Sequence, residues 1–150
     1  TGVAVMQEVE KGTITLDSPI HELIDPSLLR QNKTTLLELW GGNKQVLRIT
    51  IIDLLGMTSG LNDYDDGQLN IWTLTHPNSD MDPFDMLAVT NKTLTCSNVP
   101  CPAYYSSINF VLLGLVMQEI RSLAAWEDLD QLDIIHSSKR PLCVTTYSPS

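Results

Sequence analysis

The chain contains several serines that could attack a carbonyl carbon, but none stands in a pattern that supplies an activating base. A serine hydroxyl is a weak nucleophile unless a neighbouring group takes its proton. No serine is followed three positions later by a lysine, the spacing that places both on one helix face. Ser59 lies between Gly56 and Gly60, but the spacing differs from the Gly-x-Ser-x-Gly turn that exposes a nucleophile. The sequence therefore shows no serine nucleophile of its own.

Clusters of metal-ligating residue types are equally incomplete. Asp63, Asp65, Asp66 and Gly67 resemble part of a calcium loop, but the spacing of oxygen ligands and the terminal glutamate of such a loop are missing. A solvated acidic turn explains them better. The histidines are scattered, without a partner at metal-ligand spacing: His21, His76 and His136. We therefore expect no metal and no cofactor.

The net charge limits the partners of the chain. Its 18 acidic and 9 basic residues give a formal charge of −9, which is unfavourable for nucleic acids and for an anionic membrane surface. The longest apolar run, Phe110 to Met117, has eight residues, whereas a membrane-spanning helix needs about 20. We expect no nucleic-acid partner and no membrane span.

The cysteines and two glycosylation sequons favour an oxidising, secretory compartment. Cys96 and Cys101 bracket a short loop that one disulfide could close, and Cys143 is left over. Asn32 and Asn91 each begin an Asn-Lys-Thr sequon that could accept a glycan. The alternative is a cytosolic protein with three ordinary thiols.

Capping signals predict where several helices begin and end. The first helix runs to about Lys11 and ends at Gly12. A short helix follows Pro19 and ends near Asp25-Pro26. Thr50 and Asp53 favour the start of a helix that stops near Gly56. We expect residues 58–81 to form a surface excursion with one helical turn near residues 69–74.

The second half of the chain contains the strongest helix signal. Asp82, Pro83 and Asp85 have the order typical of a helix start. Ser106 or Ser107 could cap the next helix, and another is expected from residue 126 to 135. The residues expected on the broad apolar face of the helix after Ser107 are Phe110, Val111, Leu113, Leu115, Val116 and Ile120. The segment is therefore predicted to be mainly helical, with little or no sheet.

Three stretches, in order, resemble one enzyme family. The first, from Val5 to Ile20, reads VMQEVEKGTITLDSPI and resembles a helix that runs into G-x-L-x-L-D-D-P-V. The second, from Ile49 to Tyr64, reads ITIIDLLGMTSGLNDY and is similar to I-T-I-x-x-L-L-x-H-T-S-G-L. The third, from Tyr104 to Gly114, reads YYSSINFVLLG and resembles F-x-Y-S-N-x-x-Y-x-L-L-G. Together they resemble the serine penicillin-recognising family: class C β-lactamases, D-alanyl-D-alanine carboxypeptidases and related esterases.

The resemblance implies an α+β fold of the β-lactamase and DD-peptidase type, of which this chain is a partial, mainly helical segment. It also implies an acyl-enzyme formed by the serine of a Ser-x-x-Lys motif, which we expect immediately before Thr1. In the class C branch a tyrosine near that lysine moves the proton. The matching residue is Tyr105, with Tyr104 as the alternative by one register. The implied substrate is a small molecule or peptide with a β-lactam, D-Ala-D-Ala peptide or ester bond.

Two positions depart from the family pattern. Ser107 stands where the family usually has an asparagine that contacts the substrate, so recognition of an amide is in doubt. Met57 replaces the usual histidine before the Thr-Ser-Gly turn, in which Ser59 is implied to support the site without attacking substrate. A non-catalytic binding or scaffold protein with the same fold is therefore the alternative function.

The resemblance also divides the chain. Residues 1–135 are expected to form an incomplete β-lactamase-related domain, and residues 136–150 a divergent tail. We expect the segment to be inactive alone and to need the remainder of its own domain for stability, because the helical layer of this fold packs against a sheet.

Overall fold

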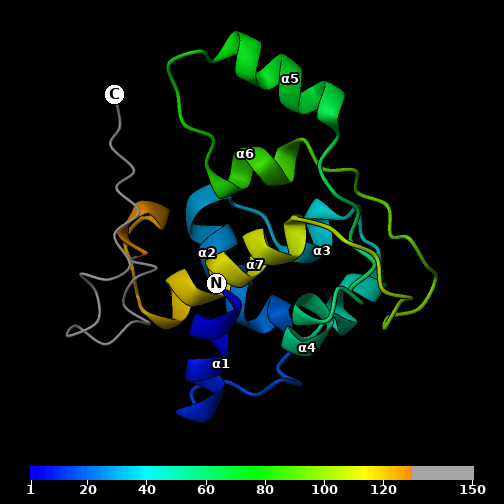
Figure 1. Cartoon of the computed structure of the whole chain (residues 1–150), viewed down its shortest axis with the longest axis vertical. Helices are drawn as coiled ribbons and strands as arrows, with labels where there is room; N and C mark the ends of the chain where they lie inside the picture. The colour runs from blue at the N-terminus through cyan, green and yellow to red at the C-terminus, as the bar shows by residue number, and fades with distance from the viewer. Residues whose placement is uncertain (130–150) are drawn as a thin grey trace.

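The computed structural model describes residues 1–129, which form a helical body around one long apolar helix (Figure 1). The elements are α1 (Gly2–Glu10), α2 (Ile20–Asn32), α3 (Leu36–Leu39), the 3-10 helix η1 (Lys44–Arg48), α4 (Ile51–Leu55), α5 (Asp66–Thr75), α6 (Pro83–Ala88), α7 (Ile108–Ile120) and the 3-10 turn η2 (Trp126–Asp128). Isolated β-bridges occur, but no sheet forms within this range. The prediction of a mainly helical segment is confirmed. Among the described residues, no helix is both long and apolar enough to cross a bilayer.

Helix α7 lies at the centre and is surrounded by α1, α2, α4 and α6 (Figure 1). Its side chains are buried on nearly every side, which explains why the sequence of this helix is apolar almost throughout. The predicted burial of Val111, Leu113, Leu115 and Val116 is confirmed. Phe110 is an exception, because 37% of its surface is exposed and it does not join the core.

Helix α2 passes through the proline at which it was predicted to end. Pro26 lies inside the helix, which continues to Asn32. A proline within a helix costs about 3 kcal/mol because one hydrogen bond is lost and the ring crowds the preceding turn. Continuing the helix buries Leu28 completely, and Asp25 before the proline accepts a hydrogen bond from the backbone N–H of Leu36 at 2.8 Å. Tertiary packing therefore overrides the local signal.

The predicted caps are present. Gly12 follows α1 with a φ of 75°, a left-handed conformation that glycine adopts without strain. The carboxylate of Asp53 accepts the backbone N–H of Thr50 at 3.0 Å at the start of α4. At the start of α6, Asp82 accepts the N–H groups of Phe84 and Asp85, at 2.7 and 2.8 Å. These helix starts are determined within one turn of sequence.

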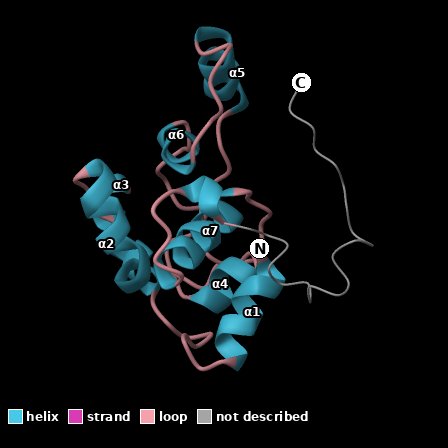
Figure 2. Ribbon diagram, turned by 90° about the vertical axis from the view of Figure 1, so that its left-hand side faces the viewer, coloured by secondary structure: helices cyan, strands magenta, loops and turns pink. Residues whose placement is uncertain are grey.

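Helix α5 is longer than the single turn predicted within residues 58–81. It has ten residues, none of them buried, and stands apart from the body (Figures 1 and 2). Asp65 caps it by accepting the N–H of Gln68 at 2.8 Å. Trp72 stacks on His76 one turn later, with ring centroids 4.7 Å apart. Local capping and stacking thus stabilise a helix that contributes nothing to the core.

The predicted helix from residue 126 to 135 is wrong in its described part. Residues 126–128 form only the 3-10 turn η2, and residues 130–135, like the tail 136–150 and Cys143, lie outside the described residues. Trp126 packs directly on Gly114 of α7, where a Cβ atom would lie 2.3 Å from the indole ring. Glycine at position 114 therefore allows the turn to close over α7.

A buried carboxylate joins the end of α1 to the end of α7. Glu8 is 5% exposed and accepts hydrogen bonds from Lys11 at 2.9 Å and from Thr13 at 3.2 Å. The guanidinium of Arg121 lies 3.7 Å from the same carboxylate. The hydrogen bond from Lys11, assisted by the charges of Lys11 and Arg121, lowers the pKa of Glu8 below 4.5.

The lowered pKa of Glu8 makes part of the stability of the domain depend on pH. The ionised Glu8 stabilises the fold above about pH 4.5, and the contribution is lost as the pH falls through the lowered pKa. In the complete domain, Glu8→Gln should lower the free energy of unfolding by about 1–2 kcal/mol at pH 7. The difference from wild type, followed by thermal melts, should shrink as the pH falls through the lowered pKa of Glu8. Glu10→Gln, an exposed residue on the same helix, serves as the control, and an equal loss at pH 7 and pH 2 would contradict the assignment.

Candidate active site

Two chain segments far apart in sequence meet in front of α7. One is the turn at residues 57–61, and the other is the segment 101–107, which we call the tyrosine strap because it contains both candidate tyrosines. The N–H of Cys101 donates to the carbonyl of Thr58 at 2.7 Å, and the N–H of Tyr104 donates to that of Met57 at 2.9 Å. Backbone hydrogen bonds therefore hold the strap on the turn.

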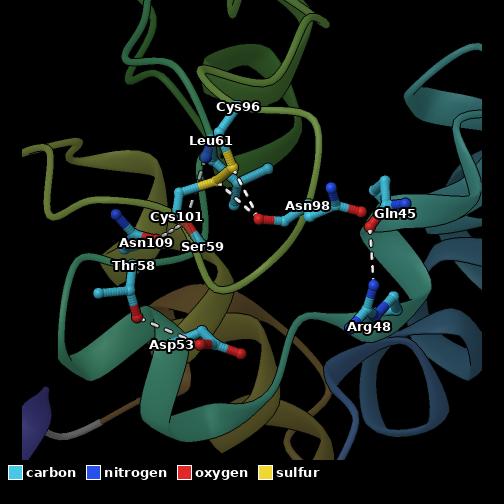
Figure 3. The surroundings of a disulfide bond; sticks show 10 residues. All are labelled: Gln45, Arg48, Asp53, Thr58, Ser59, Leu61, Cys96, Asn98, Cys101 and Asn109. Atoms are coloured by element: carbon cyan, nitrogen blue, oxygen red, sulfur yellow. Dashed lines mark hydrogen bonds between the residues drawn. A yellow bond between two sulfur atoms is a disulfide. The ribbon is translucent and has the colours of Figure 1, made fainter.

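A disulfide closes the loop that leads into the strap. Cys96 and Cys101 are bonded, with Cα atoms 5.8 Å apart, so the predicted pairing is confirmed. The loop is also attached to the turn through the N–H of Thr95, which donates to the carbonyl of Gly60 at 2.8 Å. Figure 3 shows the disulfide directly above Ser59 and Asn109. The disulfide therefore closes the loop of residues 96–101 just before the two candidate tyrosines.

Gly60 allows the disulfide and the turn to approach each other. Its φ is 74°, and a Cβ atom at this position would lie 2.3 Å from the Sγ of Cys101. Both the backbone conformation and the space require glycine here. The glycine of the Thr-Ser-Gly pattern is therefore required both by the turn and by the close contact with the disulfide.

A buried asparagine links the turn to the strap, and sequence reasoning missed it. Asn109 is completely buried in the first turn of α7. Its Oδ1 accepts the hydroxyl of Ser59 at 2.5 Å (Figure 3). Its Nδ2 donates to the carbonyl of Ser106 at 3.0 Å. The available signal was a polar residue within an otherwise apolar helix, at a position pointing away from Ser107.

Ser59 and Met57 face inward and support this contact. Ser59 is 1% exposed, so its hydroxyl is not accessible to a substrate, and it also accepts the N–H of Leu61 at 3.2 Å. Met57 has a φ of 58°, unusual for a residue with a side chain, and its Sδ lies 3.1 Å from the Nδ2 of Asn109. The residue that replaces the family histidine therefore contributes a soft acceptor to the buried cluster.

Ser106 and Ser107 at the start of α7 have different partners. The hydroxyl of Ser106 donates to the carbonyl of Asn62 at 3.1 Å and accepts the N–H of Ile108 at 3.3 Å. Ser107 donates its N–H to Asp63 at 3.1 Å, and its hydroxyl lies 3.4 Å from the same carboxylate. Of the two predicted capping residues, only Ser106 bonds to the helix through its side chain.

Asp63 has a structural role that was not predicted from the sequence, where it was explained as part of a solvated acidic turn. Its carboxylate accepts hydrogen bonds at the N-terminus of α7, where the helix dipole favours a negative charge. Asp65 instead caps α5. Within residues 1–129, no three metal-ligating side chains come together. Asp63 and Asp65 therefore accept hydrogen bonds from backbone N–H groups at helix starts.

The candidate tyrosines are the most accessible aromatic residues of this region. Tyr105 is 66% exposed and Tyr104 54%. Between them, only the N–H of Tyr104 bonds to the turn. The strap therefore presents the side chain of Tyr105 to solvent from a backbone that is held on both sides, by Tyr104 and by Ser106.

A recess lies away from the turn and the strap, between the C-terminal ends of α2 and α7. It is lined by Arg30, Gln31, Glu119, Ser122, Leu123 and Ala124. Arg30 and Glu119 form a two-point ion pair across it, with nitrogen–oxygen distances of 3.1 and 2.5 Å. The charges of this recess satisfy one another, and none of its residues belongs to the turn or the strap.

One further titratable group lies outside the site. Lys92 follows α6, donates to the carbonyl of Leu87 and lies 4.7 Å from the centre of the Trp40 ring. Burial lowers the pKa of Lys92 to about 8. Lys92 thus packs against the helical body and has no recorded contact with the strap.

Comparisons with known proteins agree with the fold. The sequence profile of the Beta-lactamase family matches residues 1–131. Among solved structures, the D-stereospecific amidohydrolase from Streptomyces sp. is similar over 83% of this chain and 35% of its own, with 24% identity and a TM-score of 0.60. An octameric penicillin-binding protein homologue from Pyrococcus abyssi covers 84% of this chain and 26% of its own, with 18% identity and a TM-score of 0.48. No curated protein matches.

The chain thus spans about a third of the length of the amidohydrolase. The family profile covers both the turn and the strap, and the amidohydrolase shares the fold. The chain belongs to the beta-lactamase family, and its described residues form a helical part of the beta-lactamase-like fold.

Proposed function

We propose that the protein containing this chain is a serine hydrolase that cleaves an amide or ester bond through an acyl-serine intermediate. A Ser-x-x-Lys motif, expected before Thr1, would supply the nucleophile and its base. Tyr105 would move the proton between the serine and the leaving group, and Ser107 would contact the substrate. The observation that supports this best is the strap, whose backbone is fixed on the turn while Tyr105 remains 66% exposed.

The exposure of Tyr105 matters because proton transfer requires direct access to the reacting atoms. A proton-transferring group must come within about 3 Å of its partner. A fully buried phenol would be limited to neighbours within its own segment. A solvent-facing phenol on a fixed backbone can instead meet a nucleophile presented by another part of the domain. This segment would thus contribute one catalytic side chain and no nucleophile.

The test is covalent labelling of the complete protein. A fluorescent penicillin or fluorophosphonate should label one serine, and mass spectrometry should place it in the Ser-x-x-Lys motif. Replacing that serine by alanine provides the control and should abolish the signal. An intact, folded protein that reacts with neither probe would contradict the proposal.

The alternative is a non-catalytic binding or scaffold protein with the same fold. Two observations favour it: Ser107 replaces the family asparagine, and Met57 replaces the family histidine and turns inward to Asn109. This alternative predicts that the serine or lysine of the upstream motif is replaced. Reading the sequence that precedes Thr1 distinguishes the two functions.

The remainder of the domain would cover the apolar side chains that α1 and α4 expose. Val3 is 63% exposed, Met6 39% and Ile52 48%. The two helices touch, because a Cβ atom at Gly2 would lie 3.7 Å from Leu55. Since the chain spans 35% of the amidohydrolase, the rest of the domain is the proposed cover.

Residues 1–129 alone should therefore self-associate and should not melt cooperatively. Combining Val3→Ser with Ile52→Ser should reduce the self-association seen by light scattering. Combining Ile71→Ser with Leu74→Ser, on α5 where both residues are exposed, should reduce it less. A cooperative melt of the monomeric wild-type segment would contradict the proposal that the rest of the domain covers these side chains.

Secretion and N-glycosylation complete the proposal. Asn32 and Asn91 are both exposed. Asn91 lies in a turn in which its Oδ1 accepts the N–H and the hydroxyl of Thr93, each at 3.0 Å. Expression through a eukaryotic secretory pathway should yield two glycans, and Asn32→Gln and Asn91→Gln should each remove one by mass. Secreted protein without either glycan would contradict the assignment.

A further inference from the structure

We propose that Asn109 is the positioning residue of Tyr105, an inference that rests on the proposed hydrolase function. Asn109 does not face the substrate, because it is completely buried. It acts through the backbone on either side of the tyrosine. The side chain joins the carbonyl before α7 to the turn on which the strap lies, and so determines where the phenol oxygen of Tyr105 can reach.

Both polar atoms of the Asn109 side chain have hydrogen-bond partners. Its Oδ1 accepts the Ser59 hydroxyl at 2.5 Å. Its Nδ2 donates to the carbonyl of Ser106 at 3.0 Å and lies 3.1 Å from the Sδ of Met57. A buried amide with all its partners in place is rigid, because losing any bond leaves a polar group unsatisfied away from water.

The bonds of Asn109 bracket Tyr105. Ser106, whose carbonyl Asn109 holds, directly follows the tyrosine in sequence. Tyr104, whose N–H donates to Met57 at 2.9 Å, directly precedes it. Asn109 contacts the side chain of Met57, so the same amide touches the anchors on both sides. The backbone of Tyr105 has little freedom to move unless this cluster breaks.

The phenol of Tyr105 depends on its backbone for its position. The side chain of Tyr105 is 66% exposed, so few packing contacts restrict it. The orientation of its Cα–Cβ bond is then the main determinant of where the hydroxyl can go. A displacement of about 1 Å in a reacting group can lower a rate by about 100-fold.

The chemistry of an amide explains why asparagine fits this position. Oδ1 must accept from Ser59 while Nδ2 must donate to Ser106, and only an amide offers both from one short planar group. An aspartate could accept from Ser59, but its second oxygen would face the carbonyl of Ser106 without a proton. A leucine would leave the Ser59 hydroxyl without its acceptor, and the Ser106 carbonyl would keep only the backbone N–H of residue 109, at 3.2 Å.

The experiment uses the complete protein and compares Asn109→Ala with Gln118→Ala. Gln118 is a matched control: it is also an amide on α7, is 2% exposed, and its carbonyl accepts the N–H of Leu123, at the end of the helix away from the turn and the strap. We expect Asn109→Ala to lower the kcat for an acylating substrate by about 100-fold, with KM changed less than about threefold. Gln118→Ala should leave kcat within about threefold of wild type, although both variants lose a buried side chain.

A double-mutant cycle separates positioning from a general loss of structure. If Asn109 acts through Tyr105, Asn109→Ala should cost much less in a Tyr105→Phe background, because the hydroxyl being positioned is already gone. If Asn109→Ala does not fold, Ser59→Ala keeps the amide and removes the donor to its Oδ1, together with the acceptor for the N–H of Leu61. It should still reduce kcat while leaving KM unchanged.

The outcomes are distinguishable. A wild-type protein that no acylating probe labels overturns the proposed function, and the positioning role with it. A labelled wild-type protein in which Asn109→Ala and Gln118→Ala have the same kcat overturns the positioning role alone. So does an equal loss of kcat in the presence and absence of the Tyr105 hydroxyl, or a change confined to KM.

Discussion

Replacing Tyr105 by phenylalanine is expected to lower the acylation rate of the complete protein by about 10²–10⁴-fold, because general acid–base groups contribute rate factors of this size. The substitution removes one hydroxyl and keeps the ring. Since the side chain is 66% exposed, the free energy of unfolding should change by less than about 0.5 kcal/mol. Stopped-flow measurement of acylation by a chromogenic substrate, together with a thermal melt, would show both.

Tyr104→Phe is the matched control. Tyr104 is 54% exposed and neighbours Tyr105, but its recorded contribution to the site is its backbone N–H, which the substitution keeps. Its acylation rate should remain within a few-fold of wild type. A large loss in Tyr104→Phe with none in Tyr105→Phe would mean that the family motif aligns one residue earlier. No loss in either variant would remove both tyrosines from the mechanism.

The second large effect is expected at Gly60, where Gly60→Ala should destabilise the complete domain by about 2–5 kcal/mol. Part of this is the left-handed φ of 74°, which costs a residue with a side chain about 1–2 kcal/mol. The rest comes from the new Cβ atom, which would lie 2.3 Å from the Sγ of Cys101 and force the disulfide loop to move. Denaturant unfolding measures the loss, and the labelling rate should fall as the strap shifts.

Gly12→Ala separates the two contributions. Gly12 has a φ of 75°, almost the same as Gly60, but a Cβ atom there would meet nothing within 4 Å. Its cost should therefore reflect the backbone alone. Removing the disulfide with Cys96→Ala and Cys101→Ala should relieve part of the Gly60→Ala penalty, since the clashing Sγ is absent. Equal losses at Gly60 and Gly12 would mean that the disulfide contact is unimportant.

The pairing of Ser107 with Asp63 bears on what the site could recognise. An asparagine would offer a substrate both a donor and an acceptor, whereas the short hydroxyl of Ser107 lies 3.4 Å from a carboxylate. A hydroxyl that donates its proton to Asp63 can act towards a substrate mainly as a hydrogen-bond acceptor. If Ser107 contacts the substrate as proposed, it would therefore favour an N–H donor there.

Much of the local structure could be predicted because its determinants lie within one helical turn. Asp53 and Asp82 begin α4 and α6 where the capping patterns placed them, since a side-chain oxygen and the backbone N–H groups it accepts are only two or three residues apart. The pairing of Cys96 with Cys101 was accessible for the same reason: five positions separate them. Three ordered motifs were sufficient to predict the family, and capping signals and apolar periodicity predicted a mainly helical segment.

Two of the failed predictions have the same cause, which is that distant residues decided them. Pro26 should end a helix on local grounds, yet α2 continues because Leu28 is buried against the rest of the fold. Phe110 belongs to an apolar run, yet it is left partly exposed where α7 begins beside the strap. A pattern of apolar residues shows that a helix is buried, but it does not show which side remains open.

The sequence by itself determined the family, the helix starts, the disulfide and the identity of the candidate tyrosines. Only the tertiary structure decided how Tyr105 is held. Asn109 reaches Ser59 across 50 positions, and Asp63 reaches Ser107 across 44. No local periodicity records contacts of that range, because each depends on two segments being brought together by the packing of α7 against its neighbours. The residues that could perform chemistry were visible in the sequence, whereas those that position them became visible only once the chain was folded.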